Sequence, residues 1–159
     1  MHNVLPLLFN FSQLVVGRGF VAGVSARGRA LLEIEGSEVW ISGVTPVGIT
    51  AVGQSRDEAF TEFHTAWVEV LFDVANEAGS FDEFERECAK FLASSAQPVS
   101  AVWSTALEEV RRSNHTDPGL MSKNADENPP KHEIVNLTAA VEQLGPQVNA
   151  LGMELQAAA

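Results

Sequence analysis

The sequence holds a single cysteine, Cys88, so no disulfide can form within the chain. A chain without disulfides suits a reducing compartment, and we expect a cytoplasmic protein. Long apolar runs are also missing. The most apolar stretch, residues 4–16, is too short to cross a bilayer and lacks a basic segment before it. We therefore expect no membrane association, and we interpret residues 4–16 as folded structure.

Basic residues are scarce. Ten Lys and Arg stand against 21 Asp and Glu, which gives a formal net charge of −11. Such a balance repels a phosphate backbone and argues against direct nucleic-acid binding, whereas it favours a basic protein partner. The acids are concentrated in residues 57–96, which hold ten of them and two bases. The negative potential is therefore expected to come mainly from this segment.

Signatures of catalysis are absent as well. Gly17-Arg18-Gly19 lacks the spacing of a phosphate-binding loop, and the sequence has neither an HExxH motif nor paired cysteines. We predict no catalytic residue, no cofactor and no metal. Cys88 is expected to be a small buried apolar residue, and His64 a histidine that packs its ring at the boundary of a helix. The alternative is a hydrolase that uses Cys88 with a histidine.

The first third of the chain is typical of strands. Two alternating runs flank Gly36-Ser37, which indicates a hairpin. Residues 27–29 and 45–48 are predicted to be turns. The expected strand segments are 20–26, 32–35, 39–42 and 49–52.

The clearest element is a helix that begins after Ser55. Ser55 and Glu58 form a capping box, and apolar residues then recur at helical spacing up to Ala78. A second capping box, Ser80 with Glu83, opens another amphipathic helix, and Pro98 opens a third. A final helix is expected from Ile134.

These elements predict an α+β protein. Its small, antiparallel-rich sheet of three or four strands is packed by two amphipathic helices, and helices follow at the C-terminus. The expected boundaries are an α+β domain at 1–97, an additional helix at 98–114, a linker at 115–132 and a helical tail at 133–159, which docks on the domain or on a second copy.

Acids form a stripe on the long helix, opposite its apolar side. Like charges one turn apart cost a few tenths of a kcal/mol per pair. The stripe is thus either an ordinary solvated face or a docking surface for a basic partner. Trp40, opposite to Val39 and Ile41 in its strand, is either exposed for binding or covered by helices. The candidate partner-binding residues are Glu58, Glu62, Glu69, Asp73, Glu77 and Trp40.

Residues 46–79 resemble the HicB family of antitoxins. Pro46-Val47-Gly48 stands where that family has a Pro-Gly-Cys turn, and Gly53-Gln54-Ser55-Arg56-Asp57-Glu58-Ala59 stands at its helix start. The resemblance extends over about residues 18–95. It implies a shortened ribonuclease-H-type sheet without catalytic acids, which masks a small basic ribonuclease toxin. The chain departs from the pattern at Ile49, which replaces the cysteine, and it lacks a DNA-binding motif.

The sequence therefore predicts a non-catalytic, antitoxin-like module that neutralises a basic protein and forms a homo-oligomer. Two alternatives stay open. One is a self-associating scaffold protein that uses residues 133–155 for assembly. The other is the small hydrolase described above.

Overall fold

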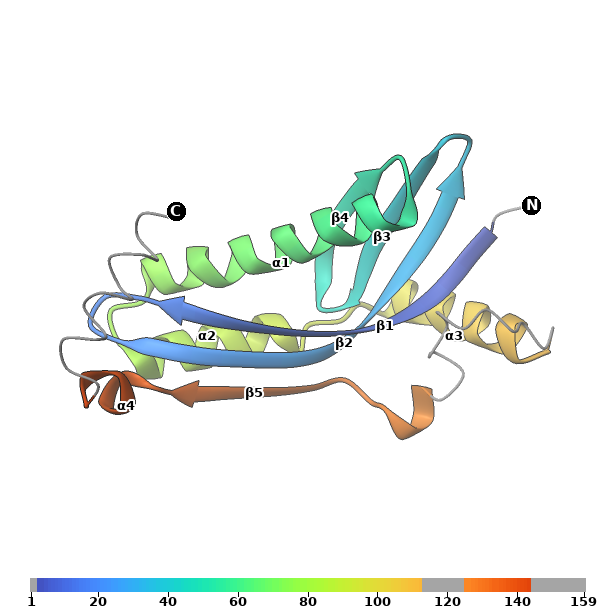
Figure 1. Ribbon diagram of the computed structural model, residues 1–159. Coiled ribbons are helices and arrows are strands. Elements are labelled where there is room, and N and C mark those ends of the chain that lie inside the picture. Colours follow the sequence, from blue (N-terminus) through green and yellow to red (C-terminus); the bar gives the residue numbers. More distant parts are fainter. Residues whose placement is uncertain (1–2, 113–124, 144–159) are drawn as a thin grey trace.

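The computed structural model describes residues 3–112 and 125–143 (Figure 1). One antiparallel sheet contains β1 (Asn3–Val16), β2 (Val21–Glu35), β3 (Glu38–Thr45), β4 (Val47–Gly53) and β5 (Lys131–Asn136). The α-helices of the described residues are α1 (Arg56–Glu77), α2 (Phe81–Leu92), α3 (Gln97–Arg112) and α4 (Thr138–Glu142). The α+β class is confirmed, while the sheet has five strands rather than three or four.

β1 and β2 form a hairpin that runs in register from Val16 opposite Val21 to Asn3 opposite Ile34. The predicted turn at residues 27–29 is wrong, because β2 passes through it without interruption. Gly28 explains the difference. A Cβ atom there would collide with the ring of Phe9 and the carbonyl oxygen of Thr45. This glycine permits close packing inside a strand instead of a change of direction.

The other side of β2 has two partners. β3 pairs with its second half, from Arg29 to Glu35, and β5 pairs with its first half, from Ala22 to Arg27. The predicted helix from Ile134 is therefore wrong in its first residues, which are in β5, and α4 starts only at Thr138. The physical reason is that the first half of β2 needs hydrogen-bond partners that β3 is too short to supply.

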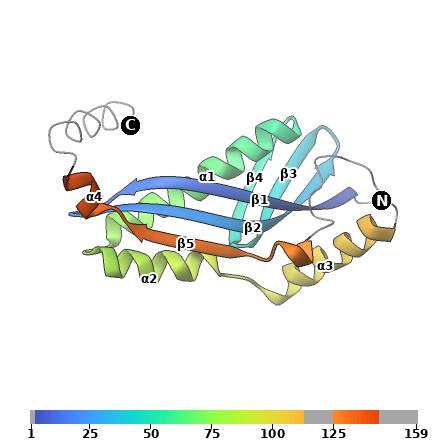
Figure 2. The same ribbon diagram turned by 60° about the horizontal axis from the view of Figure 1, so that its bottom comes forward.

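Each face of the sheet has its own core. α1 and α2 cover one face, where their apolar residues meet alternate residues of the strands, including Phe11, Val24 and Ile41. α3 covers the opposite face near the start of β1, where Trp103 and Leu107 pack on Leu31. Figures 1 and 2 show α1 and α2 along the hairpin and α3 near the beginning of β1. Leu31 is thus buried on the face that α3 covers, and its neighbours Ala30 and Leu32 are buried on the face that α1 and α2 cover.

Most of the predicted linker and tail falls on residues 113–124 and 144–159, which lie outside the described residues. The described part of the linker includes Ala125, which is fully buried in the second core. In the part of the chain that the structure describes, none of the helices has the length and apolarity needed to cross a membrane.

Candidate functional site: the acidic face of the long helix

The long helix begins and ends where the sequence predicts. Ser55 Oγ accepts a hydrogen bond from the Glu58 backbone N–H at 3.1 Å, and the Glu58 carboxylate accepts one from the Gln54 N–H at 3.2 Å. The first bond is the one that Ser55 makes in a capping box, while the Glu58 carboxylate reaches one residue beyond the N-cap, to Gln54 instead of Ser55. Glu58 is therefore occupied in the cap, although its side chain remains exposed.

Large apolar residues, spaced four apart along α1, anchor this helix to the sheet. Phe63, Trp67 and Leu71 are all 0% exposed. Phe11 of β1 lies under this row, with its ring centroid 5.2 Å from that of Trp67. A helix held by such large buried side chains presents its outer surface rigidly.

We define the acidic face of α1 as the exposed residues Glu58, Glu62, Glu69, Asp73 and Glu77. At about 100° per residue they all fall within about 100° of the helix surface. Glu69, Asp73 and Glu77 follow one another at intervals of one turn, where like charges repel. Glu77 also lies in the last turn, which carries no base. The negative end of the helix dipole makes that position unfavourable for a carboxylate.

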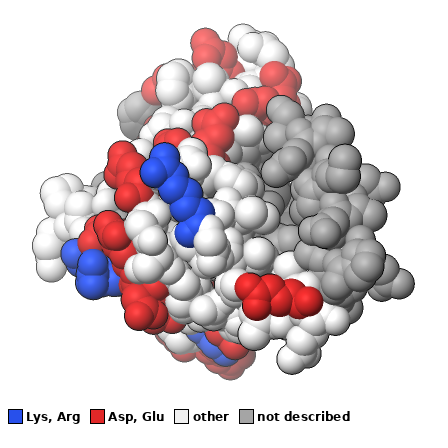
Figure 3. Space-filling model, turned by 90° about the vertical axis from the view of Figure 1, so that its left-hand side faces the viewer, with Lys and Arg blue, Asp and Glu red and all other residues white. Residues whose placement is uncertain are grey.

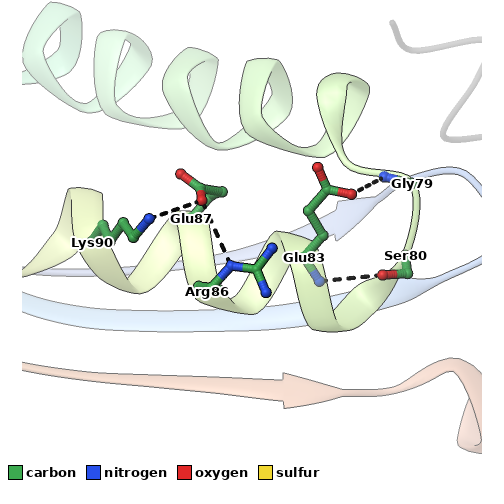
Figure 4. A network of polar contacts seen from close by, with 6 residues as sticks. All are labelled: Gly79, Ser80, Glu83, Arg86, Glu87 and Lys90. Carbon is green, nitrogen blue, oxygen red and sulfur yellow. Dashed lines mark hydrogen bonds and ion pairs between the residues drawn. The ribbon is translucent and has the colours of Figure 1, made fainter.

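No carboxylate of this face forms an ion pair among residues 3–112 and 125–143. The second helix differs. On α2, Glu87 pairs with Lys90 at 3.1 Å and with Arg86 at 3.8 Å (Figure 4). Its first turn is also closed, since Glu83 accepts from the Gly79 N–H and donates its own N–H to Ser80 Oγ. The charges of α2 are partly compensated by these pairs, whereas the five carboxylates of the acidic face form no ion pair within the described residues.

Three of the chain's other bases, Arg27, Arg29 and Arg111, lie away from the acidic face. Arg27 and Arg29 are on the face of the sheet opposite to α1, because the alternate residues Ala26 and Ala30 point into the core beneath α1 and α2. Arg111 pairs with Asp126 at 3.0 Å beside α3. Figure 3 shows the end of the molecule at the β1–β2 turn, where red acidic side chains cover more of the surface than blue basic ones.

Trp40 does not belong to the same surface. Its neighbours Val39 and Ile41 point into the core beneath α1, so Trp40 lies on the opposite face of the sheet, where it is half-buried. The structure thus separates Trp40 from the five acids with which the sequence analysis grouped it.

Cys88 and His64 have the structural positions that the sequence predicts. Cys88 is 0% exposed, and burial raises the pKa of its thiol to about 12, which disfavours the nucleophilic thiolate. His64 packs its ring 4.4 Å from that of Phe11 at the edge of α1. No group of three or more His, Cys, Asp or Glu residues suited to a metal ion occurs in the described ranges.

The sequence analysis missed the surface beside β1. Val4 of β1 and residues of α3, among them Ala101, Val102 and Glu109, line an open groove of about 360 Å³. The only signal in the sequence is indirect: residues 3–16 contain no charged side chain. The lack of charge does not by itself predict that these residues form the edge of the sheet.

No family model, no curated protein and no solved structure matches this chain.

Proposed function

We propose that this protein is a non-catalytic binding module that captures a small basic protein on the acidic face of α1. The observation that carries the proposal is the set of five exposed carboxylates on one rigid helix, none of which is ion-paired within the described residues. Their mutual repulsion is relieved when positive charge approaches. A structural role would not require this clustering.

The electrostatics favour fast and specific capture. A net charge of −11 attracts a cationic partner over a distance, and the local acidic face orients it. Because α1 is fixed by buried Phe63, Trp67 and Leu71, its backbone loses little conformational freedom on binding. Less of the interaction energy is then offset by the cost of ordering the binding surface.

The resemblance to HicB antitoxins supplies a class of partner, a small basic ribonuclease toxin that this chain would mask. The order of β1 to β4 followed by α1 supports this proposal, because the resemblance implies strands, a hairpin and a turn before the helix. We further propose that these strands and α1 correspond to the shortened ribonuclease-H-type sheet of that family. The absence of disulfides supports a cytoplasmic location.

The test starts from the reading frames next to the one that encodes this chain. We expect one of them to encode a small basic protein that arrests growth when expressed alone and is neutralised when this chain is co-expressed. The purified pair should bind more weakly as salt rises, because screening shortens the reach of surface charge to about 8 Å at physiological ionic strength.

A charge-reversed variant locates the interaction. Glu62→Lys, Glu69→Lys and Asp73→Lys together should weaken binding at low salt by at least about tenfold, given up to about 1 kcal/mol for each surface pair. The matched control reverses Glu35, Glu85 and Glu108, which are exposed on β2, α2 and α3, and changes the net charge equally. Equal affinity of the two variants, or the lack of any basic neighbour that binds, would contradict the proposal.

A further inference from the structure

β1 is an edge strand with no protection by charge. It pairs with β2 on one side, and among the described residues no strand pairs with its other side. Its 14 residues contain no charged side chain, although the chain has a net charge of −11. Natural proteins usually protect long edges with charges, prolines or bulges, since a bare edge pairs with another strand, and β1 has only Pro6 near one end. The β1–β2 register contains no bulge either.

The hydrogen-bonding pattern shows which residues of β1 face outward. The Gly17 N–H donates to the Phe20 carbonyl at 3.0 Å, so Gly17 and Phe20 are a hydrogen-bonded pair. Because such pairs alternate along an antiparallel ladder, the odd-numbered residues of β1 bond to β2 and the even-numbered residues point their N–H and C=O outward. Pro6 fits this pattern, since its missing N–H falls on the outer edge.

We propose that this edge binds the same edge of a second copy, in an antiparallel pair with twofold symmetry centred on Asn10. In this register Asn10 lies opposite Asn10 of the second copy, Pro6 opposite Leu14, and Val4 opposite Val16. A twofold interface brings the same surface of both copies together and must therefore be complementary to itself. Two features of β1 meet that requirement.

The first feature is that the missing N–H of Pro6 lies opposite a carbonyl group that already has a hydrogen-bond donor. Pro6 cannot donate a hydrogen bond to the residue opposite, which is Leu14 of the second copy. The Leu14 carbonyl already accepts a hydrogen bond from Gln13 Nε2 of its own chain at 2.9 Å. Pro6, which has no N–H to donate, thus lies opposite the Leu14 carbonyl, which accepts its hydrogen bond from Gln13 instead. A strand from an unrelated partner would not be expected to show this correspondence.

The second feature is a match of apolar surfaces. Leu14 and Val16 are 41% and 50% exposed, on the face of the sheet that carries α3. The proposed register places them beside Pro6 and Val4 of the second copy, next to the groove of about 360 Å³ that Val4 forms with α3. Val102 at this groove is 46% exposed. Pairing therefore covers exposed apolar side chains on both partners.

The acidic face of α1 does not oppose this arrangement. Phe60 and His64 are among the residues of α1 that lie beside Phe11 of β1. Glu62 and Asp73 lie about half a turn around the helix from His64, at about 100° per residue. The acids therefore point away from the paired edges, which leaves them accessible to a basic partner.

Sedimentation of the full chain over a range of concentrations tests the proposal. We expect a reversible dimer of twice 17.1 kDa. Asn10→Pro should weaken dimerisation by at least about tenfold, because it removes one central N–H donor from each copy while leaving the bonds to β2 intact. The matched control is His132→Pro, which removes the outward N–H on the side of β5 that pairs with no strand among the described residues, and it should leave the dimer unchanged. Far-UV circular dichroism verifies that both variants are folded.

Cross-linking tests the register without relying on proline. Opposed Cα atoms of a hydrogen-bonded pair are about 5.5 Å apart, so Asn10→Cys should be joined to its symmetry mate by a short thiol cross-linker. His132→Cys should not be joined, and Cys88 is buried in both variants. A monomer at every concentration, an assembly that Asn10→Pro leaves intact, or equal cross-linking at positions 10 and 132 would each overturn the proposal.

Discussion

The guanidinium carbon of Arg29 lies 4.2 Å from the centroid of the Trp103 ring, so a cation–π contact joins β2 to α3. Burial lowers the pKa of Arg29, and the nearby Asp126 partly opposes this effect. Trp103 is only 3% exposed and contributes to the core that contains Leu31 and Leu107. This contact fixes α3 to the sheet and thereby shapes the groove beside β1.

We expect Trp103→Ala to lower the free energy of unfolding by about 3–5 kcal/mol, because it removes a large buried ring. Arg29→Ala should cost less, and a double-mutant cycle should give a coupling of about 0.5–2 kcal/mol for the cation–π contact. Urea denaturation followed by circular dichroism measures both. Trp103→Phe serves as the control that keeps an aromatic face. Additive effects of the two alanine substitutions would show that the contact contributes no stability.

Gly28 is expected to tolerate no side chain. Gly28→Ala places a Cβ atom against the Phe9 ring and the Thr45 carbonyl, and backbone atoms cannot move as freely as a flexible side chain. The substitution should destabilise the protein by about 1–3 kcal/mol or more. Ser25→Ala, at an exposed position of the same strand, should have little effect. Thermal unfolding of the two variants makes the comparison, and equal midpoints would contradict the packing described here.

Cys88 should make stability depend on alkaline pH. Burial raises the pKa of its thiol from 9.0 to about 12, so the folded state keeps a proton that the unfolded state releases. The contribution of this thiol to the free energy of unfolding is therefore complete below pH 9, and it is lost progressively as the pH rises towards about 12. Cys88→Ala should remove this part of the alkaline destabilisation in urea titrations between pH 8 and 11. Rapid reaction of native Cys88 with a thiol reagent at pH 8 would show that the thiol is accessible.

Local signals in the sequence are sufficient to predict where several helices and turns lie. Ser55 with Glu58 and Ser80 with Glu83 located the starts of α1 and α2, because a capping box is complete within four residues. Gly36 located the β2–β3 hairpin, and it has a φ of +59°. The acids of α1 could be grouped because helical periodicity assigns residues to faces without knowledge of the partner element.

Signals that depend on distant residues were misread. Gly28 has the composition of a turn, yet its role depends on Phe9 and Thr45. Ile134 and Leu137 have helical spacing, yet the unpaired half of β2 holds residues 131–136 as a strand. Nothing local to Trp40 indicated which face of the sheet α1 would cover.

The sequence by itself determined the charge of the protein, the starts of its long helices and the acidic side of α1, since each depends on residues within a few turns of one another. Only the tertiary structure decided which strand forms the edge, where the bases lie relative to the acids, and which apolar residues remain exposed. These depend on the order of strands in the sheet, which is set by contacts between residues far apart in the chain.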